Sequence, residues 1–205
     1  SPVRAAEAVE RATGTSPERC RMAVSVAGSP ARAIEFLKNA ERQEARRQMV
    51  RAIDSLRHAD EADVLLIAKD LMVAINAPLA EVKSTQQAIL EQNADYLSRG
   101  AMKQLEDRNK RELSARERSG IMEALASARS LLRDVLMRLQ GVPAPAMNGD
   151  VEDIIDRLCS AATVTGATAA LDAVASAERC IARNVTPQLA IEVMLFDIRK
   201  ALTCP

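Results

Sequence analysis

Apolar residues recur at helical spacing along most of the chain, and they are densest in the segment that closes it. Thr186 can accept a backbone N–H bond at the start of a helix, and Pro187 fits the first turn, where no donor is needed. At about 100° per residue, Gln188, Glu192 and Arg199 share one narrow polar stripe, and most of the remaining surface is apolar. A helix of this kind is normally the centre of a bundle or is covered by another subunit, so we expect it to be a packing element.

The first part of the chain, residues 1–39, carries three short helical patterns. Two of them open with a Ser-Pro pair, at residues 16–17 and 29–30, which combines a capping residue with a first-turn proline. Gly14 and Gly28 end the first two patterns. Three helices of this length bury too little apolar surface to be stable alone, so we expect them to lean on something larger.

From residue 40 onward the pattern changes to long helices. Pro78 must end or kink one of them, because it cannot donate the backbone bond and its ring crowds the preceding turn. The cleanest apolar stripe covers residues 121–139, and the clearest loop covers residues 141–149. Gly166 is expected to break the chain between two of the last helices.

No segment alternates with period two, so the sequence predicts an all-α fold. The change of pattern divides it into a small three-helix domain, residues 1–39, and a larger helical-bundle domain, residues 40–205.

Composition supports a helical globular protein. The 205 residues are 48% apolar and 27% charged, with two Phe, one Tyr and no Trp. With so few aromatic rings, the core must be built mainly from Leu, Ile, Val, Met and Ala, which favours close-packed helices over a sheet. The formal net charge of zero gives no electrostatic reason for the whole chain to bind nucleic acid or a membrane tightly.

Residue types that usually carry catalysis are sparse. His58 is the single histidine, which excludes a multi-histidine metal site within this chain. The seven glycines form neither a GxxxxGK[ST] nor a GxGxxG motif. Neighbouring carboxylates, Glu106 with Asp107 and Glu152 with Asp153, lie among basic residues on polar faces and are expected to be solvated. We therefore expect no catalytic residue, no metal site and no cofactor in this chain.

The cysteines are scattered singly, at Cys20, Cys159, Cys180 and Cys204, and without a close pair they are expected to be reduced cytosolic thiols. There is no secretion signal and no apolar run of about 20 residues, so we expect a cytoplasmic protein. The chain lacks an initiator Met and opens directly into a helical pattern, which suggests an excised piece of a longer protein.

Two segments are rich in Arg and Lys, residues 41–58 and 99–118, and they suggest an alternative function. A helical nucleic-acid-binding module would use the second segment together with four arginines of the first, Arg42, Arg46, Arg47 and Arg51. Nucleic-acid binding is driven by the release of counterions, which requires several cations without acidic neighbours on one face of the protein. In both segments Glu and Asp residues are interleaved with the cations. The interleaving favours solvated faces or subunit contacts.

Two motifs resemble those of AAA+ clamp-loader subunits. Residues 27–33, Ala-Gly-Ser-Pro-Ala-Arg-Ala, resemble the start of the sensor-2 helix in the lid, with Gly28 and Arg32 at the matching positions. Residues 184–192, Asn-Val-Thr-Pro-Gln-Leu-Ala-Ile-Glu, resemble the collar helix of bacterial clamp loaders, which carries the pattern Asn-x-x-Pro-x-Leu-Ala-x-Glu. The matching positions are Asn184, Pro187, Leu189 and Glu192.

The spacing between these motifs is similar to that of a collar domain, and residues 103–108 and 131–136 also look like the delta-prime subunit of bacterial DNA polymerase III. The resemblance covers essentially the whole chain. It implies an AAA+ lid at residues 1–39 and an oligomerising collar at residues 40–205, without the preceding nucleotide-fold domain.

The resemblance further implies a scaffold for DNA replication that does not hydrolyse ATP. Such a subunit assembles with gamma/tau and delta subunits, and reaches the sliding clamp and primed DNA only through the whole complex. Gamma/tau subunits usually have Arg-Asp after the sensor-2 glycine, whereas Arg32 is followed here by Ala33, which favours delta-prime. A gamma/tau collar and a free-standing helical adaptor remain alternatives. Arg32 could either contact a neighbouring phosphate bidentately or form a salt bridge to the absent domain.

Overall fold

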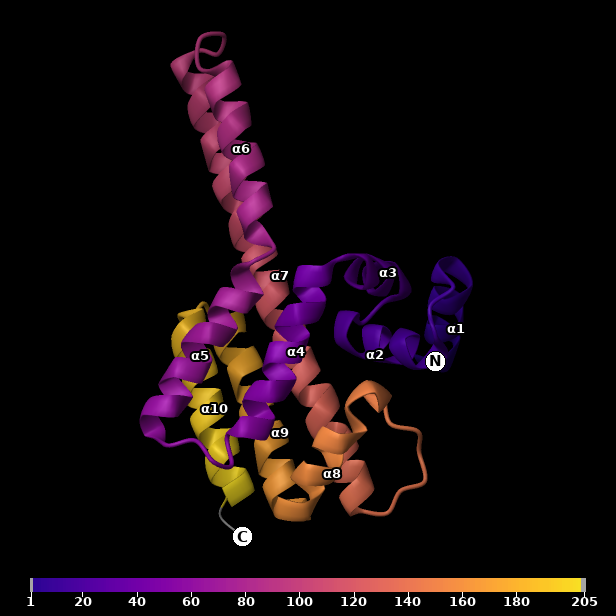
Figure 1. Ribbon diagram of the computed structural model, residues 1–205. Helices are drawn as coiled ribbons and strands as arrows, with labels where there is room; N and C mark the ends of the chain where they lie inside the picture. Colours follow the sequence, from indigo (N-terminus) through magenta and orange to yellow (C-terminus); the bar gives the residue numbers. More distant parts are fainter. Residues whose placement is uncertain (1, 204–205) are drawn as a thin grey trace.

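The fold is described by a computed structural model for residues 2–203 (Figure 1). This part of the chain forms ten α-helices and one short 3-10 helix, and it contains no strand. The all-α prediction is therefore confirmed.

The first three helices are short and pack on one another. Their bounds are α1 (Pro2–Thr13), α2 (Pro17–Ala27) and α3 (Pro30–Lys38). The predicted ends hold, since Gly14 and Gly28 follow α1 and α2 with φ of 66° and 76°. This left-handed conformation favours glycine, which has no Cβ to clash. The two Ser-Pro starts differ, because the hydroxyl of Ser29 accepts the Arg32 N–H whereas the Ser16 side chain makes no capping bond.

These helices bury a small apolar cluster of their own, which we call the N-terminal core. Val9, Cys20 and Ala33 are fully buried in it, and Phe36 is its one aromatic ring. The chain then passes directly into the next helix through Asn39, which closes α3 and caps its successor.

The remaining helices bury a second, larger apolar cluster, the main core. Their bounds are α4 (Ala40–Ser55), α5 (Glu61–Asn76), α6 (Leu79–Asn93), α7 (Arg99–Leu139), the 3-10 helix η1 (Gly149–Val151), α8 (Glu152–Ala161), α9 (Val164–Ala182) and α10 (Pro187–Thr203). Pro78 separates α5 from α6 as predicted. The stripe at residues 121–139 lies in the C-terminal half of α7, and Leu125, Leu131 and Leu132 are fully buried there.

Helix α7 is the longest element, with 41 residues, which corresponds to about 60 Å at 1.5 Å per residue. Its C-terminal half packs against α4, α8 and α9, while its N-terminal half pairs with α6. Figure 1 shows that α6 and this half of α7 project from the rest of the molecule as a two-helix arm. The arm ends in the short connection 94–98.

Helices α9 and α10 pack closely along each other, and this packing corrects the prediction for Gly166. Gly166 does not break the chain, because it lies in the first turn of α9, and the break between α8 and α9 falls at Ala162 and Thr163. A Cβ atom at Gly166 would lie 2.4 Å from the carbonyl oxygen of Ala201 in α10. The glycine is therefore required by the close approach of two backbones.

Candidate functional site

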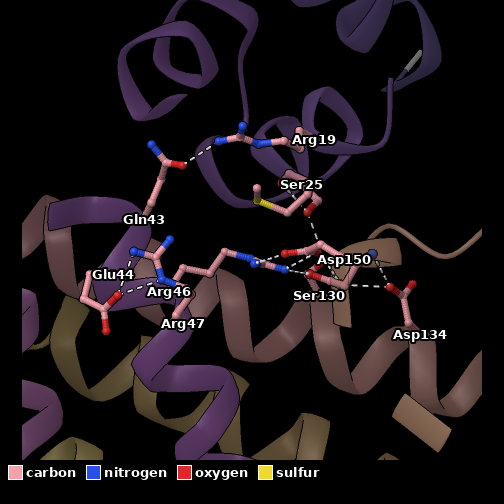
Figure 2. Close-up of polar contacts among 11 residues, drawn as sticks. Arg19, Ser25, Gln43, Glu44, Arg46, Arg47, Ser130, Asp134 and Asp150 are labelled. Atoms are coloured by element: carbon pink, nitrogen blue, oxygen red, sulfur yellow. Dashed lines mark hydrogen bonds and ion pairs between the residues drawn. The ribbon is translucent and has the colours of Figure 1, made fainter. Parts of the chain in front are cut away.

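A buried polar network joins the first three helices to the main bundle, and Figure 2 shows it. Its central residue is Arg46 of α4, whose side chain is 3% exposed. The guanidinium donates to both carboxylate oxygens of Asp150, at 2.6 and 2.8 Å, and to the Asn148 side-chain oxygen at 2.9 Å. A bidentate pair of this kind is stronger and more directional than a single hydrogen bond.

Asn148 extends the network into α7. It is fully buried, and its backbone N–H and its side-chain amide both donate to the Asp134 carboxylate at 2.8 Å. The same amide donates to the Ser130 hydroxyl at 2.9 Å. Asp134 is 5% exposed, so these donors replace the water that a carboxylate needs.

The network then crosses to α2. The Ser130 hydroxyl donates to the Ser25 hydroxyl at 2.9 Å, and Ser25 donates to the Met22 carbonyl at 2.7 Å. A second bridge lies nearer the surface, where Arg19 of α2 donates to Gln43 of α4 at 2.9 Å. We call this whole set the polar junction. It fixes α2, α4, α7 and the loop before η1 in one relative position.

The predicted sensor-2-like residues lie beside this junction. Gly28 ends α2, and Arg32 stands exposed in the first turn of α3. Arg32 makes no ion pair with any residue in 2–203. It lines a cavity of about 630 Å³ between α3, α4 and the base of the arm. In the same cavity Arg42 lies 5.7 Å above the Phe36 ring and forms a two-point ion pair with Glu123 of α7.

The four residues of the collar-like motif have separate roles. Asn184 has a φ of 62°, turns the chain after α9, and accepts a hydrogen bond from Arg118 at 3.3 Å. Pro187 is the first residue of α10, as predicted. Glu192 is half-buried and accepts from Gln188 at 2.6 Å, whereas Leu189 is 52% exposed. The motif therefore shapes a turn and a helix start. Gly28, which follows α2, and Arg32 in α3 lie in a different part of the chain.

The outward side of α10 is exposed, which differs from the pattern expected for a central helix, and it carries Lys200 and Asp197 beside two large apolar side chains. Leu189 and Val193 are 52% and 50% exposed, while the polar stripe of Gln188, Glu192 and Arg199 is half-buried. The buried side is centred near Ile191, Leu195 and Ile198, so the polar stripe falls at its border. Leu189 and Val193 therefore point away from the main core.

Helix α5 packs beside α10 and has a similar outward surface. Leu65, Leu66 and Val73 are 47%, 59% and 65% exposed, on the side opposite Val64, Ala68, Leu71 and Ile75. We define the α5–α10 face as the exposed side chains Leu65, Leu66, Val73, Leu189 and Val193. Exposed charged residues lie among them, namely Lys69 and Asp70 on α5 and Lys200 on α10. Several large apolar side chains exposed on two neighbouring helices are a feature of interaction surfaces.

Sequence reasoning missed the polar junction. It placed Arg46 among solvated cations, whereas Arg46 is buried. It correctly placed a loop between α7 and η1, but it did not predict that Asn148 in this loop is buried. Positions 46 and 150 are 104 residues apart, and no local pattern connects them. The sequence predicts that an Arg is buried only when the acidic residue that pairs with its charge is also known.

Among the other groups considered for chemistry are the Cys20 and Cys159 thiols and the Asp153 carboxyl. Burial raises the pKa of the Cys20 thiol and of the half-buried Cys159 thiol, which keeps both protonated. Cys180 is also free, and Cys204 lies outside the described residues. Hydrogen bonding by Arg157 lowers the pKa of the exposed Asp153 carboxyl. Within residues 2–203 no group of three or more His, Cys, Asp or Glu side chains could hold a metal ion.

Comparison with protein-family models, curated proteins and solved structures finds no significant match. Of the helices in residues 2–203, none is by itself long and apolar enough to cross a membrane, although the bent pair Gly149–Ala161 and Val164–Ala182 meets those limits together. The features of the molecule that bear on function are therefore the polar junction, the cavity beside it and the α5–α10 face.

Proposed function

We propose that this chain is an assembly scaffold, the lid and collar of the delta-prime subunit of a bacterial DNA polymerase III clamp loader. In this proposal residues 1–39 are the lid and residues 40–205 are the collar. The collar packs with gamma/tau and delta subunits into a ring that holds their ATPase modules while they load a sliding clamp onto primed DNA.

The division into lid and collar is supported by the two separate apolar cores. Asn39 stands between them. Its N–H donates to the Phe36 carbonyl at 3.2 Å, and its side-chain oxygen accepts the Arg42 N–H at 2.8 Å. One residue therefore ends the last helix of the small unit and starts the first helix of the large one.

The observation that carries the proposal is the α5–α10 face. Its five large apolar side chains are each about half exposed. Covering one such side chain contributes on the order of 1 kcal/mol, so covering all of them favours association by several kcal/mol. The face includes Leu189, which belongs to the motif that resembles the collar helix.

The test is to mix the chain with purified gamma/tau and delta subunits and to measure the mass of the complex by sedimentation. Wild type should enter the complex, and Leu189→Asp with Val193→Asp should remain free. Val142→Asp is a matched control, because Val142 is 40% exposed in the loop after α7 and lies outside the face. A wild-type chain that stays monomeric in the mixture would contradict the proposal.

The scaffold role also predicts that the chain alone neither hydrolyses ATP nor alters ATP binding by its partners. Arg32 is exposed and has no ion-pair partner in residues 2–203, which suits both a contact with a neighbouring phosphate and a salt bridge to another domain. Appreciable ATPase activity of the purified chain would overturn the scaffold assignment. A gamma/tau collar is the nearest variant of the proposal, because it would use the same α5–α10 face.

A nucleic-acid-binding module is the second candidate, and the arm is the observation that favours it. Several cations of α7 are exposed there without an ion pair to a described residue: Arg99, Lys103, Lys110 and Arg111. The first basic segment weakens this candidate, because Arg42 and Arg46 are bound to Glu123 and Asp150. Labelled primed DNA that binds at low salt and dissociates steeply as salt rises would support the module, and no binding at moderate salt would support the scaffold.

A further inference from the structure

A groove of about 600 Å³ lies between the small unit and α7, apart from the α5–α10 face. Its apolar surface comes from three helices and one loop: Val3 of α1, Val24 of α2, Ala126 of α7, and Met147 of the loop before η1. The hydroxyls of Ser25 and Ser130 also line it. They belong to the polar junction, so the groove lies where the small unit is fixed to the bundle.

The charged residues that line the groove are all arginines: Arg21, Arg129 and Arg133. Arg129 forms an ion pair with Glu178, and Arg133 lies 3.5 Å from Asp134, which the polar junction already holds. Arg21 is half-buried, and no described residue forms an ion pair with it. Arg21 is therefore the one arginine of the groove that has no described acidic partner, and it lies beside an apolar floor.

The hydrogen bonding of Arg21 is a second indication that the groove binds a carboxylate. Its Nε atom is buried and has no hydrogen-bond partner in the described chain. A buried donor without an acceptor costs free energy, and an arriving carboxylate beside the guanidinium would reduce that cost. The groove has the volume of an ordinary ligand site, and an apolar floor beside the Arg21 guanidinium favours a ligand that carries both apolar groups and a carboxylate.

We propose that this groove is a docking site for an acidic, apolar peptide segment of a partner protein. Apolar side chains of the segment would lie against Val24, Ala126 and Met147, and one of its carboxylates would pair with Arg21. The occupant is a peptide rather than nucleic acid, because the floor is aliphatic and none of the lining residues is aromatic, so bases have no ring to stack on. This site is separate from the proposed ring contacts, so either proposal can fail without the other.

The test uses the full chain and a short fluorescent peptide that alternates Glu and Leu, measured by fluorescence anisotropy at low salt. Binding should saturate and weaken as salt rises. Arg21→Gln should weaken it about three- to fivefold, as expected for a partly exposed charge pair. Arg11→Gln is the matched control, since Arg11 is exposed on α1 and does not line the groove, and it should bind like wild type.

A second measurement locates the peptide. In methyl NMR spectra the signals of Val24, Ala126 and Met147 should shift on titration, and those of Leu189 and Val193 should not. The proposal is overturned if the peptide does not bind, if Arg11→Gln and Arg21→Gln weaken it equally, or if the shifts appear at the α5–α10 face. Equal binding by a labelled oligothymidylate would also overturn it, because a polyanion without apolar side chains cannot use the floor.

Discussion

Arg46 and Asp150 lie 104 positions apart in the sequence and form a two-point ion pair, at 2.6 and 2.8 Å, where α4 meets η1. The Arg46 side chain is 3% exposed and that of Asp150 is 36% exposed. The pair therefore spans the border between interior and solvent. Through Asn148 and Ser130 it also determines where the small unit sits on α7.

Replacement of Arg46 by Ala should lower the free energy of unfolding by about 2–3 kcal/mol. The reason is that the buried Asn148 oxygen loses its donor and the Asp150 carboxylate loses its partner. Urea titration followed by circular dichroism measures the change. Arg47→Ala is the control on the same helix, because Arg47 pairs with Glu44 at the surface and should cost less than about 1 kcal/mol. Equal losses for the two variants would show that the junction contributes no more than a surface pair.

Gly166→Ala should destabilise the chain, even though alanine favours helix formation by about 1 kcal/mol. The new Cβ would meet the Ala201 carbonyl oxygen at 2.4 Å, so α9 and α10 would have to move apart. Overpacking of this kind typically costs about 1–3 kcal/mol. Gly100→Ala in α7 is the control, since nothing lies within 4 Å of its Cβ position, and it should stabilise the chain. A melting temperature for Gly166→Ala above wild type would contradict the close approach.

The arm holds two buried polar side chains, Gln86 of α6 and Asn109 of α7, each 8% exposed. Gln86 donates to Glu112 at 3.2 Å, while its own oxygen and the Asn109 amide nitrogen have no partner in residues 2–203. Replacing both residues with Leu removes these unpaired groups and adds apolar contact, so it should raise the melting temperature. A lower melting temperature would mean that the two amides stabilise the pairing of α6 with α7.

Acid should weaken the surface ion pairs of the bundle. Arginine neighbours lower the pKa of Glu44, Glu112 and Asp153 through hydrogen bonds from Arg47, Arg116 and Arg157, respectively. A carboxyl with a lowered folded-state pKa contributes stability above its unfolded pKa and loses that contribution as pH falls through the folded value. Stability should therefore be level from pH 7 to about 5 and decline below about 4.5. Arg157→Gln should make the decline shallower, and a variant with an unchanged acid profile would contradict the contribution of Asp153.

The helices were predictable because their signals are local. The Ser-Pro pairs, the glycines at positions 14 and 28, and Pro78 fix helix ends through the backbone chemistry of one or two residues. The same reasoning failed at Gly166, where the glycine serves a partner 35 positions away (201 − 166 = 35) rather than a turn. Sequence reasoning also did not predict which side of α10 is exposed. The periodicity shows that a helix is rich in apolar residues, but it does not show which side the neighbouring helices cover.

The candidate site was less predictable than the fold. Arg46 and Asn148 looked like surface residues, since nothing near them in the sequence indicates that Asp150 and Asp134 will surround them. The motif residues were found from their resemblance to a family, and the structure gives each a local role, such as the left-handed turn at Asn184. What those residues do with a partner depends on surfaces that belong to another chain.

The central claim is that the α5–α10 face is covered by another subunit, and hydroxyl-radical footprinting tests it most directly. The oxidation of Leu66, Val73, Leu189 and Val193 should be measured in the chain alone and in a mixture with gamma/tau and delta, with Val142 as the internal reference. The account predicts that oxidation of the four face residues falls several-fold on mixing while Val142 is unchanged. Oxidation that stays the same at all five positions would contradict it.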